Sequence, residues 1–107
     1  GAGSLEVAPG VQLVDTPEFP DEYKPEAISG RDFLNLLLSE KELNWTFLCP
    51  SGEFGPGERT GKFRLGTDRL LVGPDGTSRI SMEDYAMAMV DELETPAHSR
   101  RRFTVGY

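Results

Sequence analysis

The stretch that decides the fold is Asn44-Trp45-Thr46-Phe47-Leu48-Cys49-Pro50. It is almost entirely apolar, β-branched or aromatic, which is typical of a strand buried on both faces in a parallel sheet. Pro50 ends the predicted strand, because a proline has no N–H to donate to a neighbouring strand. We therefore expect a short central strand with a loop directly after it.

A helix is predicted on either side of this strand. The first runs from about Pro25 to about Glu40, and Pro25 suits its first turn, where no N–H is needed. The second begins after Ser81, a good N-cap with Asp84 three residues on, and Pro96 stops it. Apolar residues at steps of three and four predict one buried stripe on each helix. The stripe residues are Ala27, Phe33, Leu34, Leu37 and Leu38 in the first helix, and Met82, Tyr85, Ala86, Met89, Val90 and Leu93 in the second.

Shorter segments complete the expected order of elements. Residues 62–65 and 69–72 are predicted to form a small hairpin, residues 79–80 a short extended segment and residues 101–105 a final strand at a sheet edge. Residues 52–61 hold many glycines and are predicted to form a loop. Helices alternate with strands, which predicts an α/β layered fold. Too few strands are fit for a central sheet to complete a doubly wound fold, so the pattern predicts one half of such a fold.

The composition excludes several classes of function. The 107 residues suffice for one domain, and a hydrophobic share of 37% suits a globular chain. A net charge of −7 argues against nonspecific binding to nucleic acid or to an anionic membrane. One cysteine excludes an internal disulfide, and one cysteine with one histidine argues against a metal site. No membrane span and no secretory leader are predicted, so we expect a cytoplasmic protein.

The best candidate site is the loop after the central strand. In open α/β sheets, ligands bind outside the carboxyl ends of the strands. Pro50, Ser51, Gly52 and Phe54 lie at that rim, and Phe54 offers an aromatic face to a planar ligand. Ser4 is expected at the same rim, if the glycine-rich start of the chain ends a neighbouring strand.

The other reactive residues have simpler explanations. We expect His98 to be a solvated loop residue, Cys49 a buried and unreactive thiol, and Tyr85 a core residue. No strand–helix unit carries the glycine fingerprint of dinucleotide binding. Residues 57–62 contain a Gly-Lys pair, but the spacing is too short for a phosphate loop.

Five segments of the chain form a familiar set: residues 1–7, 43–50, 56–64, 79–86 and 102–107. Together they resemble the C-terminal half of an atypical short-chain dehydrogenase/reductase. The similar group is the NAD(P)H-binding proteins that include NADH-flavin reductases and biliverdin reductase B. The resemblance spans essentially the whole chain and implies a Rossmann-like, mostly parallel, doubly wound sheet with a small hairpin insertion. Residues 1–107 are then expected to be a single partial domain, the substrate-side half of that fold.

The resemblance also implies a cofactor and a set of roles. The cofactor is NAD(P)H, and the expected acceptor is FMN, FAD or another conjugated small molecule. Ser4 is the candidate catalytic residue, which hydrogen-bonds near the acceptor. Gly3, Pro50, Ser51 and Gly52 are the candidate residues on the nicotinamide side, and Phe54, Arg59 and Lys62 are the candidate acceptor-binding residues.

Departures from the family pattern leave the function open. The glycine-rich half is absent, so a partner is expected: the N-terminal Rossmann half, another chain or a second copy. The Tyr-x-x-x-Lys pair of typical members is also missing, since Ala27 stands four residues after Tyr23. We expect an NAD(P)H-dependent reductase. The alternatives are a non-catalytic NAD(P)-binding redox sensor of the same fold and an inert fragment.

Overall fold

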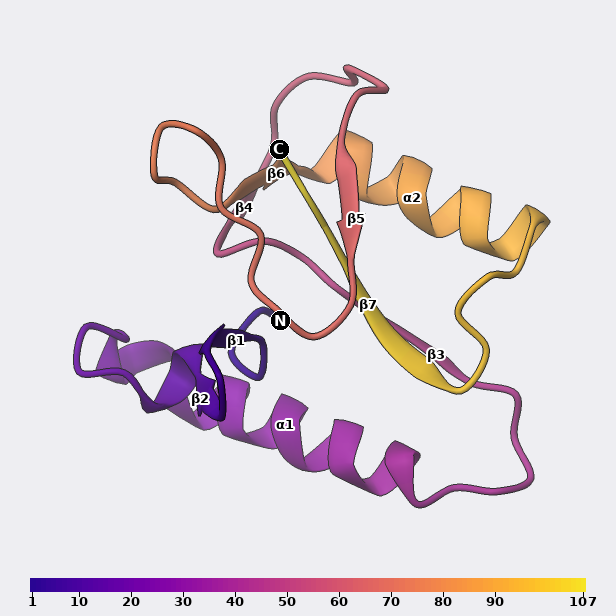
Figure 1. Ribbon diagram of the computed structural model, residues 1–107, viewed down its shortest axis with the longest axis horizontal. Coiled ribbons are helices and arrows are strands. Elements are labelled where there is room, and N and C mark those ends of the chain that lie inside the picture. Colours follow the sequence, from indigo (N-terminus) through magenta and orange to yellow (C-terminus); the bar gives the residue numbers. More distant parts are fainter.

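The computed structural model describes residues 1–107, arranged as two α-helices and seven short strands (Figure 1). In chain order, the elements are β1 (Glu6–Ala8), β2 (Val11–Gln12), two 3₁₀ turns (Leu13–Asp15 and Asp21–Tyr23), α1 (Lys24–Leu38), β3 (Thr46–Cys49), β4 (Glu53–Gly55), β5 (Arg64–Gly66), β6 (Arg79–Ser81), α2 (Met82–Glu94) and β7 (Arg101–Gly106). Both expected helices are present, and the strand expected before Pro50 forms as β3. Its expected central, fully buried position is wrong, because β3 lies at the edge of its sheet and only Cys49 in it is fully buried. Neither helix combines the length and apolarity that a membrane crossing requires.

Three small sheets organise the strands. The largest has the order β3-β7-β5, with β3 parallel to β7 and β5 antiparallel to it. The register places Cys49 opposite Thr104 and Leu65 opposite Val105. β4 and β6 form a separate parallel pair, and β1 and β2 an antiparallel pair.

The last strand lies at the centre of its sheet, so the edge position expected for it is wrong. β7 pairs with β3 on one side and with β5 on the other, and residues 103–106 are buried. A strand that is covered on both faces needs a continuous run of residues that are apolar or whose polar groups are hydrogen-bonded, and residues 103–106 provide it. The arginines at the start of β7 hid this signal: Arg101 is exposed, and the Arg102 side chain is accommodated by its bonds to Ser4 and Asp68.

The expected hairpin does not form. β5 pairs with β7 rather than with residues 69–72, which are not a strand. Leu70 instead donates its N–H to Glu6 O, so this segment runs beside the start of β1. The glycine-rich loop also contains a strand that we did not expect, β4, because Gly52 and Gly55 obscure its short extended core.

The helices lie on opposite sides of β3 and β7 in Figure 1. Phe33 of α1 packs on Phe47 of β3, with ring centroids 6.0 Å apart. Leu48, the next residue of β3, packs against the core cluster that contains Ala88 of α2, so adjacent side chains of β3 face different helices. This matches the alternation of side chains along a strand.

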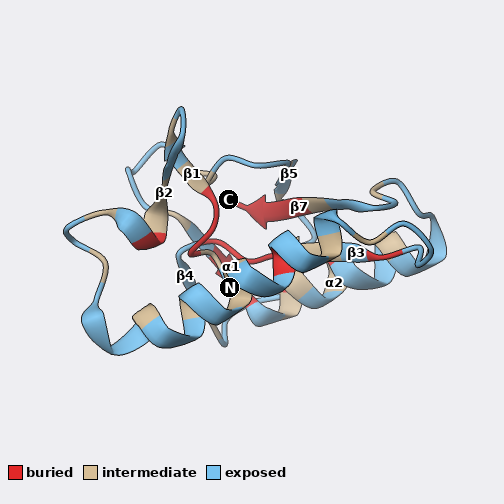
Figure 2. Ribbon diagram, turned by 90° about the horizontal axis from the view of Figure 1, so that it is seen from below, coloured by how far each residue is buried: buried red, intermediate tan, exposed pale blue.

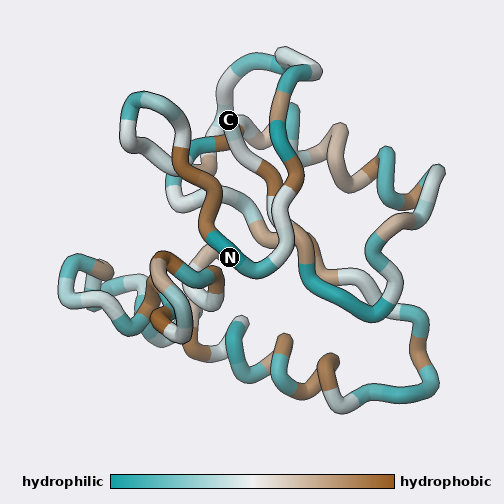
Figure 3. The backbone as a smooth tube through the Cα atoms, viewed as in Figure 1, coloured by the Kyte–Doolittle hydropathy of each residue, from teal (hydrophilic) through white to brown (hydrophobic).

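Burial is concentrated on the strands and the N-terminal loop, whereas both helices expose most of their surface (Figure 2). The stripe expected on α2 is wrong in its orientation: Asp84 and Ala88 are buried, but Met82, Met89, Val90 and Leu93 are exposed. Hydrophobic positions also recur along α1 in Figure 3, and three of them, Phe33, Leu36 and Leu38, are exposed.

Candidate functional site

The pocket that the predicted rim residues line, which we call the main pocket, lies where the N-terminal loop, α1 and the segment after β3 meet. Its volume is about 410 Å³, within the range of about 300–1,000 Å³ that is usual for small-molecule sites. Three segments line most of it: residues 1–4, one face of α1, and residues 50–54. The pocket therefore contains Gly3, Ser4, Pro50, Ser51, Gly52 and Phe54, the rim residues that the sequence singled out.

Gly3 brings the N-terminal loop against α1. A Cβ atom at Gly3 would lie 2.8 Å from Cβ of Ala27, closer than real Cβ contacts allow. Glycine is therefore needed here for a close approach of backbone to helix. The contact fixes the wall of the pocket formed by residues 1–4.

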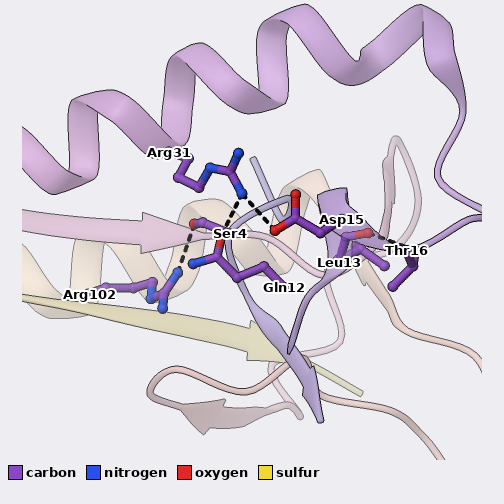
Figure 4. A network of polar contacts seen from close by, with 7 residues as sticks. All are labelled: Ser4, Gln12, Leu13, Asp15, Thr16, Arg31 and Arg102. Atoms are coloured by element: carbon purple, nitrogen blue, oxygen red, sulfur yellow. Dashed lines mark hydrogen bonds and ion pairs between the residues drawn. The ribbon is translucent and has the colours of Figure 1, made fainter. Parts of the chain in front are cut away.

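Ser4 is held by an arginine from β7. Its side chain is almost fully buried, and Nη1 of Arg102 donates to its Oγ at 2.7 Å (Figure 4). Arg102 in turn pairs with Asp68 at 3.3 Å. Burial raises the pKa of the neighbouring Cys49 thiol, and a hydrogen bond from the Ser4 side chain opposes this shift, so the Ser4 hydroxyl is engaged within the protein.

The segment after β3 is fixed by two hydrogen bonds. Oγ of Ser51 donates to Val105 O at 2.7 Å, and the N–H of Gly52 donates to Oγ of Ser78 at 3.0 Å. The Ser51 hydroxyl is thus occupied within the protein, and Ser51 contributes a positioned backbone rather than a free side chain.

Phe54 provides an aromatic surface at the other end of the pocket. Its ring packs against Tyr85, with centroids 4.8 Å apart and planes tilted by 54°. Phe54 is 40% exposed and also borders a second cavity of about 560 Å³. Burial raises the pKa of Tyr85, so its hydroxyl stays neutral as a donor to β3.

Arg59 and Lys62 do not lie in the main pocket. Nε of Arg59 lies 3.3 Å from Sδ of Met87 on α2, and Lys62 is exposed. The segment that carries them is instead docked on the start of α2. Asp84 accepts hydrogen bonds from the N–H groups of Thr60 and Gly61 and from the Thr60 hydroxyl.

Asp84 is the main polar anchor of α2. Burial raises its pKa, but hydrogen bonds from Thr60, Tyr107 and the Gly61 and Thr60 amides outweigh burial, and the pKa lies below its usual value. The Ser81 hydroxyl accepts the Asp84 N–H, which confirms the predicted N-cap. The N-terminal end of α2 is therefore filled by protein groups.

Sequence reasoning missed three pocket residues on α1 and in the turn before it: Tyr23, Glu26 and Arg31. They share a helical face with Ala27, at steps of three and four residues, and this spacing was the available signal. Nη1 of Arg31 donates to Oε1 of Gln12 at 3.0 Å and to Oδ2 of Asp15 at 2.8 Å (Figure 4).

His98 is not the solvated loop residue that we expected. Its Nδ1 lies 2.7 Å from Oε1 of Glu92, and its ring stacks on Phe103 with centroids 4.0 Å apart. Burial raises the pKa of Glu92, but hydrogen bonds from His98 and Ala97 outweigh it and lower that pKa. The pair ties the end of α2 to β7.

Cys49 is buried, and burial raises the pKa of its thiol, as expected for an unreactive cysteine. The structure contains no cluster of three or more histidine, cysteine, aspartate or glutamate side chains able to hold a metal ion.

No family model matches the chain. The chain is 48% identical over 108 residues to the uncharacterized protein YwnB of Bacillus subtilis, a match that takes in 98% of this chain and 51% of that protein. It thus spans about half the length of the curated relative that it matches.

Solved structures also match this chain over about half of their own length. A Burkholderia pseudomallei protein, provisionally named an exported protein, superposes with a TM-score of 0.95 at 52% identity, over 100% of this chain and 52% of that one. A Bacteroides thetaiotaomicron protein, provisionally named an epimerase, gives 0.93 at 50% identity, over 99% and 50%. A Streptococcus pneumoniae protein, provisionally named an NADH-flavin reductase, gives 0.92 at 41% identity, over 98% and 51%.

These similarities identify the architecture. The mixed α/β arrangement matches the C-terminal half of a Rossmann-like NAD(P)-binding fold, which confirms the expected fold class. The similar structures are reductase-like and epimerase-like proteins. Since one similar protein is named as exported, the cytoplasmic location stays a prediction.

Proposed function

We propose that this chain forms the acceptor-binding side of an NAD(P)H-dependent reductase, which transfers hydride to a flavin-like or other conjugated acceptor. The observation that carries the proposal is the main pocket at the carboxyl end of β3, where open α/β sheets place their ligands. The pocket combines a fixed backbone, a buried serine and an exposed aromatic ring. The similarity to a Streptococcus pneumoniae protein provisionally named an NADH-flavin reductase supports the same activity.

Different residues of the chain orient the two planar rings, the nicotinamide and the acceptor. NAD(P)H, when bound, supplies the hydride. Pro50, Ser51 and Gly52 shape the wall beside the nicotinamide, and the bond from Ser51 to Val105 keeps that wall rigid. Phe54 covers the acceptor, and Ser4, which Arg102 holds at the pocket wall, hydrogen-bonds to an acceptor oxygen or nitrogen.

The residues present fit the nicotinamide end of the cofactor but not its phosphates. At the first turn of α2, Oγ of Ser81 accepts the Asp84 N–H and the Glu83 carboxylate accepts the Gly57 N–H, so the docked loop already covers this helix start, where a pyrophosphate would bind. α1 begins after Tyr23 without a glycine-rich loop. The proposal therefore includes a nucleotide-binding half outside residues 1–107, and we expect the isolated chain to bind NAD(P)H too weakly for a micromolar titration to detect.

The test is a set of substitutions in the complete protein that carries this chain. Phe54→Ala should lower kcat/KM for flavin and quinone acceptors about tenfold, because a stacked aromatic contributes about 1.5 kcal/mol. Phe54→Tyr keeps the ring and should retain activity. Leu36→Ala removes an exposed apolar side chain that does not line the pocket and is the control.

Two outcomes would contradict this function. Equal kcat/KM in all three variants would remove Phe54 from the acceptor site. Tight NAD(P)H binding without turnover over the acceptor panel would instead support the non-catalytic redox sensor.

A further inference from the structure

Arg31 is the only lysine or arginine side chain that lines the main pocket. It projects from α1, and its side chain is 24% exposed. Arg31 and Glu26 are the two side chains of opposite charge in the pocket lining, so Arg31 is the side chain there that would attract an anionic ligand.

The guanidinium of Arg31 is held along one side only. Nη1 makes both of its protein contacts, to Gln12 and to Asp15 (Figure 4). Nε and Nη2 donate to no protein group. These two nitrogens form a parallel pair of donors, the edge that binds two oxygens of a carboxylate or phosphate at once.

The partners of Arg31 position it without neutralising it fully. Gln12 is uncharged, and the Asp15 side chain is 56% exposed, so water screens much of that ion pair. Thr16 donates its hydroxyl to Leu13 O at 2.8 Å and stabilises the turn that carries Asp15. Glu26 also lines the pocket, but it is exposed and its charge is screened as well.

We propose that Arg31 anchors an anionic group of the acceptor, a phosphate or carboxylate, through its Nε and Nη2 edge. This inference rests on the proposed function and names the acceptor class: a planar conjugated ring that carries an anionic arm. FMN belongs to this class and riboflavin, which has the same ring without the phosphate, does not.

The experiment compares FMN with riboflavin in the complete protein that carries this chain. We expect kcat/KM for FMN to exceed that for riboflavin about tenfold or more, and Arg31→Gln to reduce this ratio about tenfold. Arg31→Lys keeps the charge but loses the paired donors, and it should reduce the ratio partly. Lys24→Gln removes one charge from the same helix outside the pocket and should keep the ratio.

Binding measurements separate the remaining outcomes. Quenching of flavin fluorescence should show tighter binding of FMN than of riboflavin, and Arg31→Gln should remove the difference. An FMN preference that survives Arg31→Gln, or is absent from the unsubstituted protein, overturns the inference. An increase in KM for NADH alone overturns it too, since the anion would then belong to the cofactor. FMN preference in binding with no turnover of any acceptor overturns the proposed function and supports the anchor.

Discussion

Gly3 determines how close the N-terminal loop comes to α1. Its missing Cβ leaves room for Ala27, which would otherwise lie 2.8 Å away. Gly3→Ala should therefore lower the free energy of unfolding by about 1–3 kcal/mol through overpacking. Urea denaturation measures this, and Gly1→Ala is the control, since nothing lies within 4 Å of a Cβ there. Equal midpoints for the two variants would show that the loop does not press on α1.

Asp84 should make stability depend on pH in the acid range. Its pKa is lowered in the fold, so its contribution is full above the unfolded-state pKa of about 3.9 and is lost as pH falls through the lower folded value. Asp84→Asn should cost about 2–4 kcal/mol at pH 7, because four donors lose a carboxylate partner.

The measurement is thermal denaturation of both proteins between pH 7 and pH 2. The gap in Tm should stay constant down to about pH 4 and shrink below it. Asp91→Asn, an exposed position on the same helix, should change Tm little at any pH. A gap that is independent of pH would show that the charge of Asp84 does not stabilise the fold.

The helix α2 is oriented by a polar anchor rather than by its apolar stripe. Asp84 and Ala88 face the protein, while the more hydrophobic side of the helix is exposed. The four hydrogen bonds to the Asp84 carboxylate are satisfied only in this orientation. A buried carboxylate without partners costs more than exposed methionine or leucine side chains, which explains the preference.

The parallel pairing of β7 with β3 is continued beyond the end of β3 by a side-chain hydrogen bond from Ser51. The ladder with β3 ends at Cys49, and the Ser51 hydroxyl then caps Val105 O. Ser51→Ala should lower the free energy of unfolding by about 1–3 kcal/mol, since a buried carbonyl loses its donor. Chemical denaturation measures this, with Ser29→Ala on the exposed face of α1 as control. Unchanged stability would mean that the loop after β3 holds its place without this bond.

The whole molecule exposes more surface than a compact monomer does. Its accessible area is 6892 Å², whereas a monomeric protein of this mass exposes about 5,900 Å². Many of the exposed large hydrophobic side chains lie on the two helices. Such patches promote association, since burying one leucine or phenylalanine contributes roughly 1.5–3 kcal/mol.

We therefore expect the isolated 107-residue chain to associate or to fold only partly. Sedimentation velocity at micromolar concentration, with a thermal melt, measures both properties. Leu36→Lys places a charge on the exposed apolar face of α1 and should reduce association, whereas Asn35→Lys, on the same helix, should not. A compact monomer with a cooperative melt would show that these residues close their own core.

The sequence by itself determined the local elements. The apolar run before Pro50 specified β3, Ser81 specified the start of α2, and the order of helices and strands specified an α/β fold. The rim residues of the pocket also followed from the chain, because the carboxyl end of a parallel strand has a fixed relation to the sheet. These features depend on propensity, capping and the direction of one strand, all of which are local.

Only the tertiary structure decided which elements pair and which faces are buried. The central place of β7, the partner of β5 and the existence of β4 depend on hydrogen bonds between residues far apart in the chain. The inward face of α2 depends on donors that Thr60 and Tyr107 bring from elsewhere. Arg31 entered the site in the same way, because its position depends on Gln12 and Asp15, which precede it by 19 and 16 residues. Long-range pairing is chosen by the free energy of the whole assembly of elements, and no local pattern in the sequence carries that information.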